Sequence, residues 1–140
     1  MKTNLKFYWL LVLTTFMMVS FTSCEDDEEI GYDLSGVCGQ TWYGDFGASD
    51  IDGYPLYSEL MFVAGQSNSH GSGWEKTYYQ DNLEPCYQDT FDWVVDNGIL
   101  YIYYRNQSPL VIHDFYVSHR TFKGYFENGL EFYLYLDRRW

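Results

Sequence analysis

Residues 130–136 read Leu130-Glu131-Phe132-Tyr133-Leu134-Tyr135-Leu136, in which apolar residues alternate with glutamate and tyrosine. Successive side chains of a β-strand point to opposite faces of a sheet. The four apolar residues therefore share one face, and Glu131, Tyr133 and Tyr135 share the other. One face belongs to a core, while the other meets solvent or a partner. The pattern predicts a half-buried strand of an antiparallel sheet.

Similar short segments, rich in aromatic and β-branched residues, fill the chain from residue 34 onward. We expect further strands at residues 34–46, 57–64, 71–79, 86–95, 99–105, 110–117 and 121–126. Asp96-Asn97-Gly98 and Glu127-Asn128-Gly129 predict hairpin turns, because Asn-Gly accepts positive φ angles. Consecutive hairpins predict an all-β fold, a single small antiparallel up-and-down barrel of about 7–8 strands, whose closure removes exposed strand edges.

The sequence contains 15 Tyr, 10 Phe and 5 Trp, and the alternation divides them between two faces. Trp42, Phe62, Trp93 and Phe132 fall on the apolar parity and are expected to fill the barrel. The candidate ligand face consists of the tyrosines on the opposite parity, Tyr101, Tyr103, Tyr116, Tyr133 and Tyr135, with Tyr78 or Tyr79 beside them. A tyrosine combines an apolar ring with a hydroxyl, which suits a sugar ring or a protein partner. Alternatively, tyrosine is simply a strong strand former on a half-buried face.

The N-terminal residues 1–23 have the parts of an export signal. Lys2 and Lys6 supply the positive start, and residues 7–19 are almost entirely apolar. This run is shorter than the ~20 residues that a membrane-spanning helix needs, and an acidic run follows closely. We therefore expect a cleaved signal helix at residues 1–23, a flexible acidic tether at 24–33, and the barrel domain at 34–140.

Phe21-Thr22-Ser23-Cys24 resembles a bacterial lipobox. The resemblance implies that Cys24 is acylated and becomes the first residue of a lipid-anchored protein. Several acyl chains hold a protein firmly, since each buried methylene adds ~0.8 kcal/mol. The alternative is an ordinary secretory signal with an incidental cysteine.

The acidic run that follows, Glu25, Asp26, Asp27, Glu28 and Glu29, resembles the surface-export signal of Bacteroidota lipoproteins. This resemblance implies attachment to the outer membrane and favours its outer face over its periplasmic face. The same run also suits a solvated spacer, because like charges repel one another.

The acidic balance of the chain limits its partners. The formal charge is −12, and loss of Lys2 and Lys6 with the signal takes the mature chain to −14. Nucleic-acid binding and docking on anionic lipid both depend on clustered Lys and Arg, so we expect neither. Membrane attachment would then come from the lipid anchor alone.

Two cysteines remain once Cys24 is assigned to lipid. Cys38 and Cys86 would lie in an oxidising compartment, where a disulfide between them is expected to contribute on the order of 4 kcal/mol. The alternative is two free thiols in the core.

The arrangement also resembles the lipocalin-like lipoprotein domains of Bacteroidota. The resemblance rests on Gly39-Gln40-Thr41-Trp42, Leu60-Met61-Phe62 with Gly71-Ser72-Gly73, and Phe91-Asp92-Trp93 with Gly98-Ile99-Leu100-Tyr101-Ile102, besides the lipobox. It covers most of residues 34–104 and supports the fold far more than any activity.

No metal-ligand spacing, nucleophile motif or cofactor motif accompanies these features. Asp50 and Asp52 fall in a turn that lacks the remaining ligands of a calcium loop. The leading hypothesis is a non-catalytic outer-membrane lipoprotein whose barrel binds a glycan, another ligand or an envelope protein. A carrier of a small apolar ligand inside the barrel is the second hypothesis, and an enzyme or inhibitor domain is the third.

Overall fold

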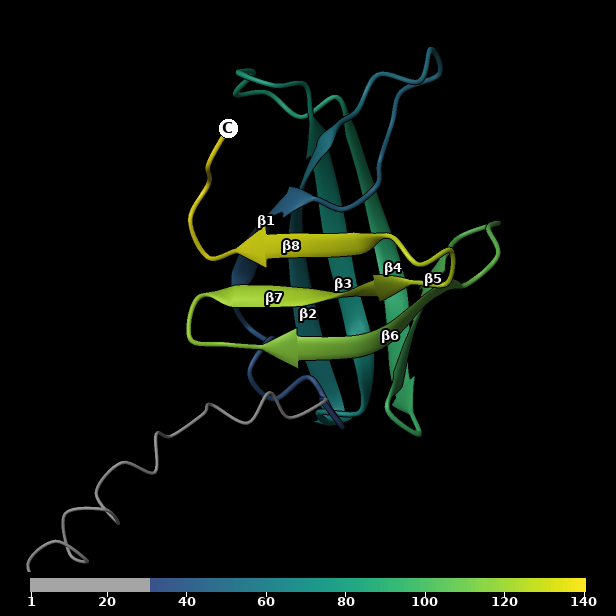
Figure 1. Ribbon diagram of the computed structural model, residues 1–140. Coiled ribbons are helices and arrows are strands. Elements are labelled where there is room, and N and C mark those ends of the chain that lie inside the picture. Colours follow the sequence, from purple (N-terminus) through teal and green to yellow (C-terminus); the bar gives the residue numbers. More distant parts are fainter. Residues whose placement is uncertain (1–30) are drawn as a thin grey trace, which may run out of the picture.

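The computed structural model describes residues 31–140 as an all-β barrel (Figure 1). The signal segment, Cys24 and the acidic run at residues 25–29 lie outside the described residues. The strands are β1 (Thr41–Asp45), β2 (Tyr57–Ser67), β3 (His70–Tyr78), β4 (Tyr87–Asp96), β5 (Ile99–Tyr104), β6 (Leu110–Val117), β7 (Thr121–Phe126) and β8 (Glu131–Tyr135). Within residues 31–140, no helix is long and apolar enough to cross a membrane.

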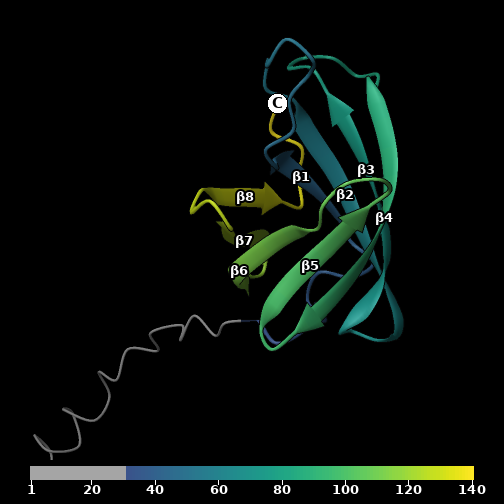
Figure 2. The same ribbon diagram turned by 90° about the vertical axis from the view of Figure 1, so that its right-hand side faces the viewer.

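Each strand pairs antiparallel with the next, and β8 returns to β1 to close the barrel. The closing ladder is short: it joins Tyr43 to Tyr135, Gly44 to Leu134 and Asp45 to Tyr133. The predicted closed up-and-down topology is therefore confirmed. Strands β6–β8 cross in front of the long strands β2–β4 and form the opposite wall of the barrel (Figures 1 and 2).

The predicted inward faces are confirmed in most strands. Trp42, Phe62, Trp93 and Phe132 are all buried, and Phe115 and Phe122 join them in one continuous core. Trp93 and Phe62 both pack edge-to-face within this cluster. A side chain at Gly73 would collide with the Phe91 ring and with the backbone oxygen of Met61, so glycine gives these rings their space. The middle of the barrel is thus filled by side chains.

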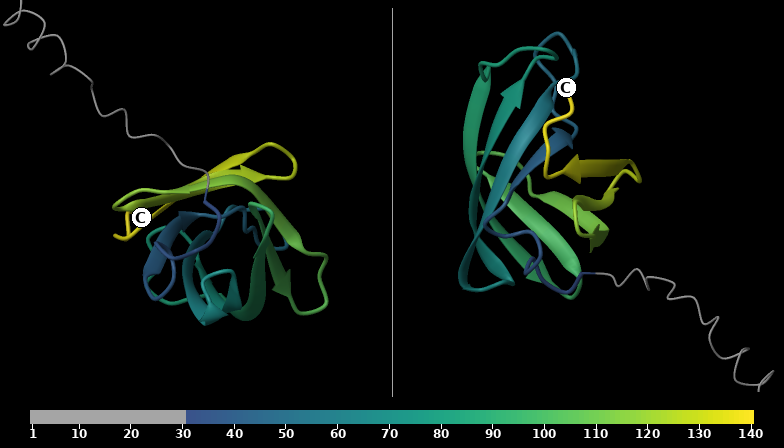
Figure 3. Two further views of the ribbon diagram at one scale, coloured as in Figure 1. Left: turned by 90° about the horizontal axis from the view of Figure 1, so that it is seen from below. Right: turned by 90° about the vertical axis from the view of Figure 1, so that its left-hand side faces the viewer.

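The first strand is shorter than the predicted segment 34–46. Residues 34–39 form turns that close the lower end of the barrel, seen from below in Figure 3, and Leu34 and Val37 are fully buried there. The indole nitrogen of Trp42 donates to the Val37 backbone oxygen at 2.9 Å, which ties these turns to β1. The segment had the composition of a strand because it supplies apolar residues to the same core.

The two predicted hairpin turns differ from each other. At β4–β5, Asn97 and Gly98 have φ angles of 52° and 76°, as expected for a tight Asn-Gly turn. At β7–β8 only Gly129 has a positive φ, and the Asn128 side chain accepts a hydrogen bond from the Leu130 nitrogen. Leu130 consequently belongs to the turn and is 64% exposed, so its predicted place in the core is wrong.

The predicted Cys38–Cys86 disulfide is also wrong, because both residues are free thiols. Cys38 adjoins Gly39, whose nitrogen donates to the Phe62 backbone oxygen in the middle of β2. The Cys86 nitrogen and thiol instead both donate to the Thr77 backbone oxygen, and Thr77 pairs with Ser58 near the start of β2. The two sites are separated by about four residues of strand, roughly 13 Å, whereas disulfide bonding needs Cα atoms within about 7 Å.

Candidate functional site

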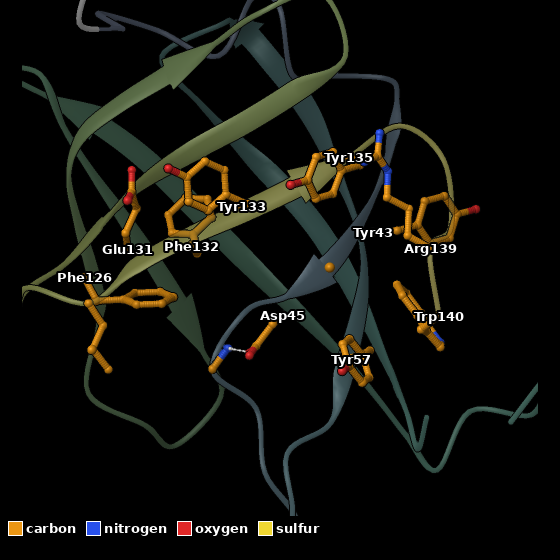
Figure 4. Close-up of a pocket in the computed structure, with 13 residues that line it drawn as sticks. Tyr43, Asp45, Tyr57, Phe126, Glu131, Phe132, Tyr133, Tyr135, Arg139 and Trp140 are labelled. Atoms are coloured by element: carbon orange, nitrogen blue, oxygen red, sulfur yellow. Dashed lines mark hydrogen bonds between the residues drawn. The ribbon is translucent and has the colours of Figure 1, made fainter. Parts of the chain in front are cut away.

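A pocket of about 500 Å³ opens on the outer surface where β1 meets β8 (Figure 4). We call it the seam pocket. The side chains that line it are Tyr43, Asp45, Tyr57, Phe126, Leu130, Glu131, Phe132, Tyr133, Tyr135, Arg139 and Trp140, with Gly44 and Gly47 contributing backbone. In Figure 4, Glu131 and Tyr133 lie on one side, Tyr57 and Trp140 lie on the other, and Asp45 lies between them.

The pocket exists because the β1–β8 ladder that closes the barrel is short. β1 ends at Asp45, and Gly47 follows with a φ of 79°, which turns the chain away from β8. The Asp45 carboxylate fixes this turn by accepting a hydrogen bond from the Gly47 nitrogen at 2.9 Å. Beyond this point β8 has no neighbour on the β1 side, and Glu131 and Phe132 border the opening.

The segment after β8 builds the second wall. The Trp140 ring stacks on Tyr57, with centroids 5.2 Å apart and planes 18° apart, and it also contacts Tyr43 at 5.8 Å. Arg138 lies over both Trp140 and Tyr78, and its guanidinium donates to the Asn82 backbone oxygen at 2.6 Å. The wall is therefore fixed by ring contacts and by one charge-assisted hydrogen bond.

Polar groups are distributed around these rings. Arg139 lies 3.8 Å from the centroid of the Tyr135 ring and also pairs with Asp137. A hydrogen bond to Glu131 raises the pKa of the Tyr133 hydroxyl. Burial, together with nearby Glu59, raises the pKa of Tyr43. The Tyr133 hydroxyl is therefore already paired with Glu131, on one side of the pocket.

One donor near the pocket lacks a partner. The indole nitrogen of Trp140 is buried and has no hydrogen-bond partner among residues 31–140. An unpaired buried donor costs free energy, so the contacts of the Trp140 ring with Tyr57 and Tyr43, and not its indole nitrogen, hold it in place. The pocket thus combines aromatic rings, two carboxylates and one guanidinium.

The structure brings together only part of the predicted tyrosine face. Tyr133 and Tyr135 line the seam pocket. Tyr116 lies on the outer surface of β6 beside Lys123, whose ammonium is 5.0 Å from its ring. Tyr101 and Tyr103 belong to β5, which pairs with β4 and β6 and contributes nothing to the pocket.

Sequence reasoning missed the other half of the pocket. Tyr43 and Tyr57 had the outward parity of their strands, which was a usable signal. Trp140 and Arg139 follow the last strand, and no periodicity predicts where such a segment folds back.

The predicted turn with Asp50 and Asp52 has a structural role. Asp50 accepts hydrogen bonds from the Asp52 and Tyr54 nitrogens and from the Tyr79 hydroxyl, so its carboxylate organises the β1–β2 loop. No group of three potential metal-ligating side chains occurs within the described part of the chain. The filled middle of the barrel leaves little room for the apolar ligand of a carrier.

Comparison with protein-family models, with curated proteins and with solved structures found no match.

Proposed function

We infer that this chain is a non-catalytic binding protein that recognises carbohydrate in the seam pocket. We further propose that a lipid on Cys24 anchors it to the outer membrane and that the acidic run at residues 25–29 directs it to the cell surface. The observation that carries the binding proposal is the convergence of five aromatic rings, from Tyr43, Tyr57, Tyr133, Tyr135 and Trp140, on a pocket that also holds Asp45, Glu131 and Arg139.

This set of groups matches the chemistry of a sugar. The C–H face of a pyranose ring packs on aromatic rings, while its hydroxyls need both acceptors and donors. Asp45 and Glu131 supply acceptors, and Arg139 supplies donors. A pocket of about 500 Å³ lies in the usual range for small-ligand sites and has room for one or two sugar rings.

The position of the pocket is compatible with tethering through the N-terminus. The described chain begins at the lower end of the barrel in Figure 1, whereas the segment after β8 rises toward the opposite end. A tether leaving from residue 31 would therefore start away from the wall formed by Trp140. This arrangement supports presentation of the pocket to the medium.

The binding proposal predicts that Tyr133→Ala lowers carbohydrate affinity about tenfold, roughly 1.4 kcal/mol, because it removes a stacking ring. The protein would be prepared without residues 1–23 and with Cys24→Ser, screened on a glycan array, and titrated with the best glycan by calorimetry. Tyr103→Ala is the matched control, since Tyr103 is 44% exposed and Tyr133 is 43% exposed, but Tyr103 lies outside the pocket. Failure to retain any glycan, or equal losses in the two variants, would refute carbohydrate binding at this pocket.

The anchor has a separate test. Cells that express the wild-type chain with labelled palmitate should yield a labelled protein, and the Cys24→Ala variant should carry no label. Cys38→Ala is the control, because this thiol lies in the folded domain and should not affect labelling. A labelled Cys24→Ala protein would contradict the lipid anchor.

A further inference from the structure

A second pocket, of about 390 Å³, lies at the end of the barrel opposite residue 31. We call it the mouth pocket. It is framed by the β1–β2 and β5–β6 loops, and its inner wall is made by Glu75 of β3, Asp89 of β4 and Tyr104 of β5. It therefore belongs to the open end of the barrel interior, whereas the seam pocket lies on the outer surface.

Glu75 is the central polar group of this pocket. It is half-buried on the inward face of β3. Its two carboxylate oxygens accept hydrogen bonds from Ser58 at 2.5 Å and from Tyr104 at 2.6 Å. These neutral hydroxyls hold the carboxylate in one orientation but do not balance its charge.

Asp89 makes the local charge more negative. It pairs directly with Glu75 across the β3–β4 ladder and lines the same pocket. Like charges opposite one another on a sheet are destabilising. Burial, with a further contribution from Asp89, raises the pKa of Glu75. The Glu75–Asp89 pair therefore lowers the stability of the fold. Such a cost is typical of charged groups that are retained for binding.

No lysine, arginine or histidine of the described chain lines this pocket. Arg120 and Arg139 both form ion pairs with Asp137, which follows the last strand and does not line this pocket. Two carboxylates with hydroxyls also fall short of the six to eight oxygens of a calcium site. An inorganic cation therefore fits poorly.

The remaining lining is aromatic and apolar. Phe46, Tyr87 and Tyr104 contribute rings, and Leu56 and Leu110 contribute aliphatic surface. A carboxylate beside aromatic rings binds an organic cation through charge and through cation–π attraction. An ammonium with N–H groups would use the carboxylate lone pairs that Ser58 and Tyr104 leave available.

We propose that the mouth pocket binds a small organic amine, with Glu75 as the counter-ion of its ammonium group and the rings of Tyr87 and Tyr104 against its carbon skeleton. Asp89 adds negative potential at the entrance. This site is independent of carbohydrate binding in the seam pocket.

The probe is phenethylamine, with 2-phenylethanol as a neutral analogue of similar shape, titrated into isotopically labelled protein and followed by NMR. Phenethylamine should shift the resonances of Glu75, Asp89 and Tyr104 in a saturable manner, and 2-phenylethanol should not. Glu75→Gln should weaken phenethylamine binding about tenfold while keeping the fold.

Asp92→Asn is the matched control. It removes the same charge from an exposed position on β4, and it should leave phenethylamine affinity unchanged. The proposal is overturned if phenethylamine causes no saturable shifts in the mouth pocket, if 2-phenylethanol binds as well, or if Glu75→Gln binds like the wild type. Tyr133→Ala should bind phenethylamine with the affinity of the wild type. Failure of the amine proposal is therefore distinguishable from failure of carbohydrate binding in the seam pocket.

Discussion

Replacement of Trp42 by alanine is expected to lower the free energy of unfolding by about 4 kcal/mol, a large part of the stability of a small domain. The Trp42 side chain is fully buried in β1, and its ring packs edge-on against Phe122 with centroids 5.9 Å apart. Its indole nitrogen also donates to the Val37 backbone oxygen. Alanine would leave a cavity, and the Val37 oxygen would lose its partner. Urea unfolding followed by circular dichroism measures the loss.

Trp74→Ala is the control for the loss of a tryptophan. Trp74 is half-buried on the outer face of β3, and its ring lies below the Lys76 ammonium. We expect a cost near 1 kcal/mol, because an exposed cation–π pair contributes little and no cavity forms in the core. Similar losses in the two variants would mean that Trp42 is not part of a tightly packed core. A Trp42→Phe variant should lie between wild type and Trp42→Ala.

The alternation of apolar residues predicted the barrel well. In β4, β5 and β8 it placed the correct side chains inside, because each of these strands keeps the two-residue period without interruption. The hairpin signal at Asn97-Gly98 was equally reliable, since a tight turn imposes φ angles that few residues accept. These are local constraints, and the sequence carries them directly.

The failures arose where contacts distant in sequence decide the structure. β6 contains an irregularity at Asp114, where φ is 48° and the register shifts between His113 and Tyr116. This extra residue places both Ile112 and Phe115 in the core, which a strict two-residue period cannot do. The turns at residues 34–39 have the composition of a strand because their apolar side chains, Leu34 and Val37, are buried in the lower end of the barrel.

The candidate sites were harder to predict than the fold. Five outward tyrosines were expected to form one face, yet the strand order separates Tyr101 and Tyr103 from the seam pocket. Glu75 was not singled out, because nothing local distinguishes an inward glutamate from the many solvated acids of this chain. Its position follows only from the register of β3 against β2 and β4.

Glu75→Gln is expected to stabilise the protein near neutral pH and to leave its stability unchanged near pH 4. Burial raises the pKa of Glu75 in the folded state. As pH rises above the ordinary glutamate pKa, the unfolded chain therefore releases this proton before the folded chain does. The native state then loses about 1.4 kcal/mol per pH unit relative to the unfolded state, until the folded pKa is passed. Glutamine carries no charge, keeps a carbonyl acceptor, and avoids this loss.

Thermal unfolding between pH 4 and pH 8 tests this expectation, and 1 kcal/mol corresponds to roughly 5 °C in Tm for a domain of this size. Asp137, whose pKa is lowered by a hydrogen bond from Arg120, contributes the opposite pH dependence, but it is present in both proteins and cancels in their difference. Asp92→Asn should change the Tm little, because substitution at an exposed position usually changes the free energy of unfolding by less than about 0.5 kcal/mol. A Glu75→Gln variant that is less stable than wild type at pH 7 would show that the Glu75 charge stabilises the fold by itself. If Glu75 instead serves an ammonium ligand, phenethylamine at pH 7 should raise the Tm of the wild type and leave that of Glu75→Gln nearly unchanged, since a ligand stabilises only the state that binds it.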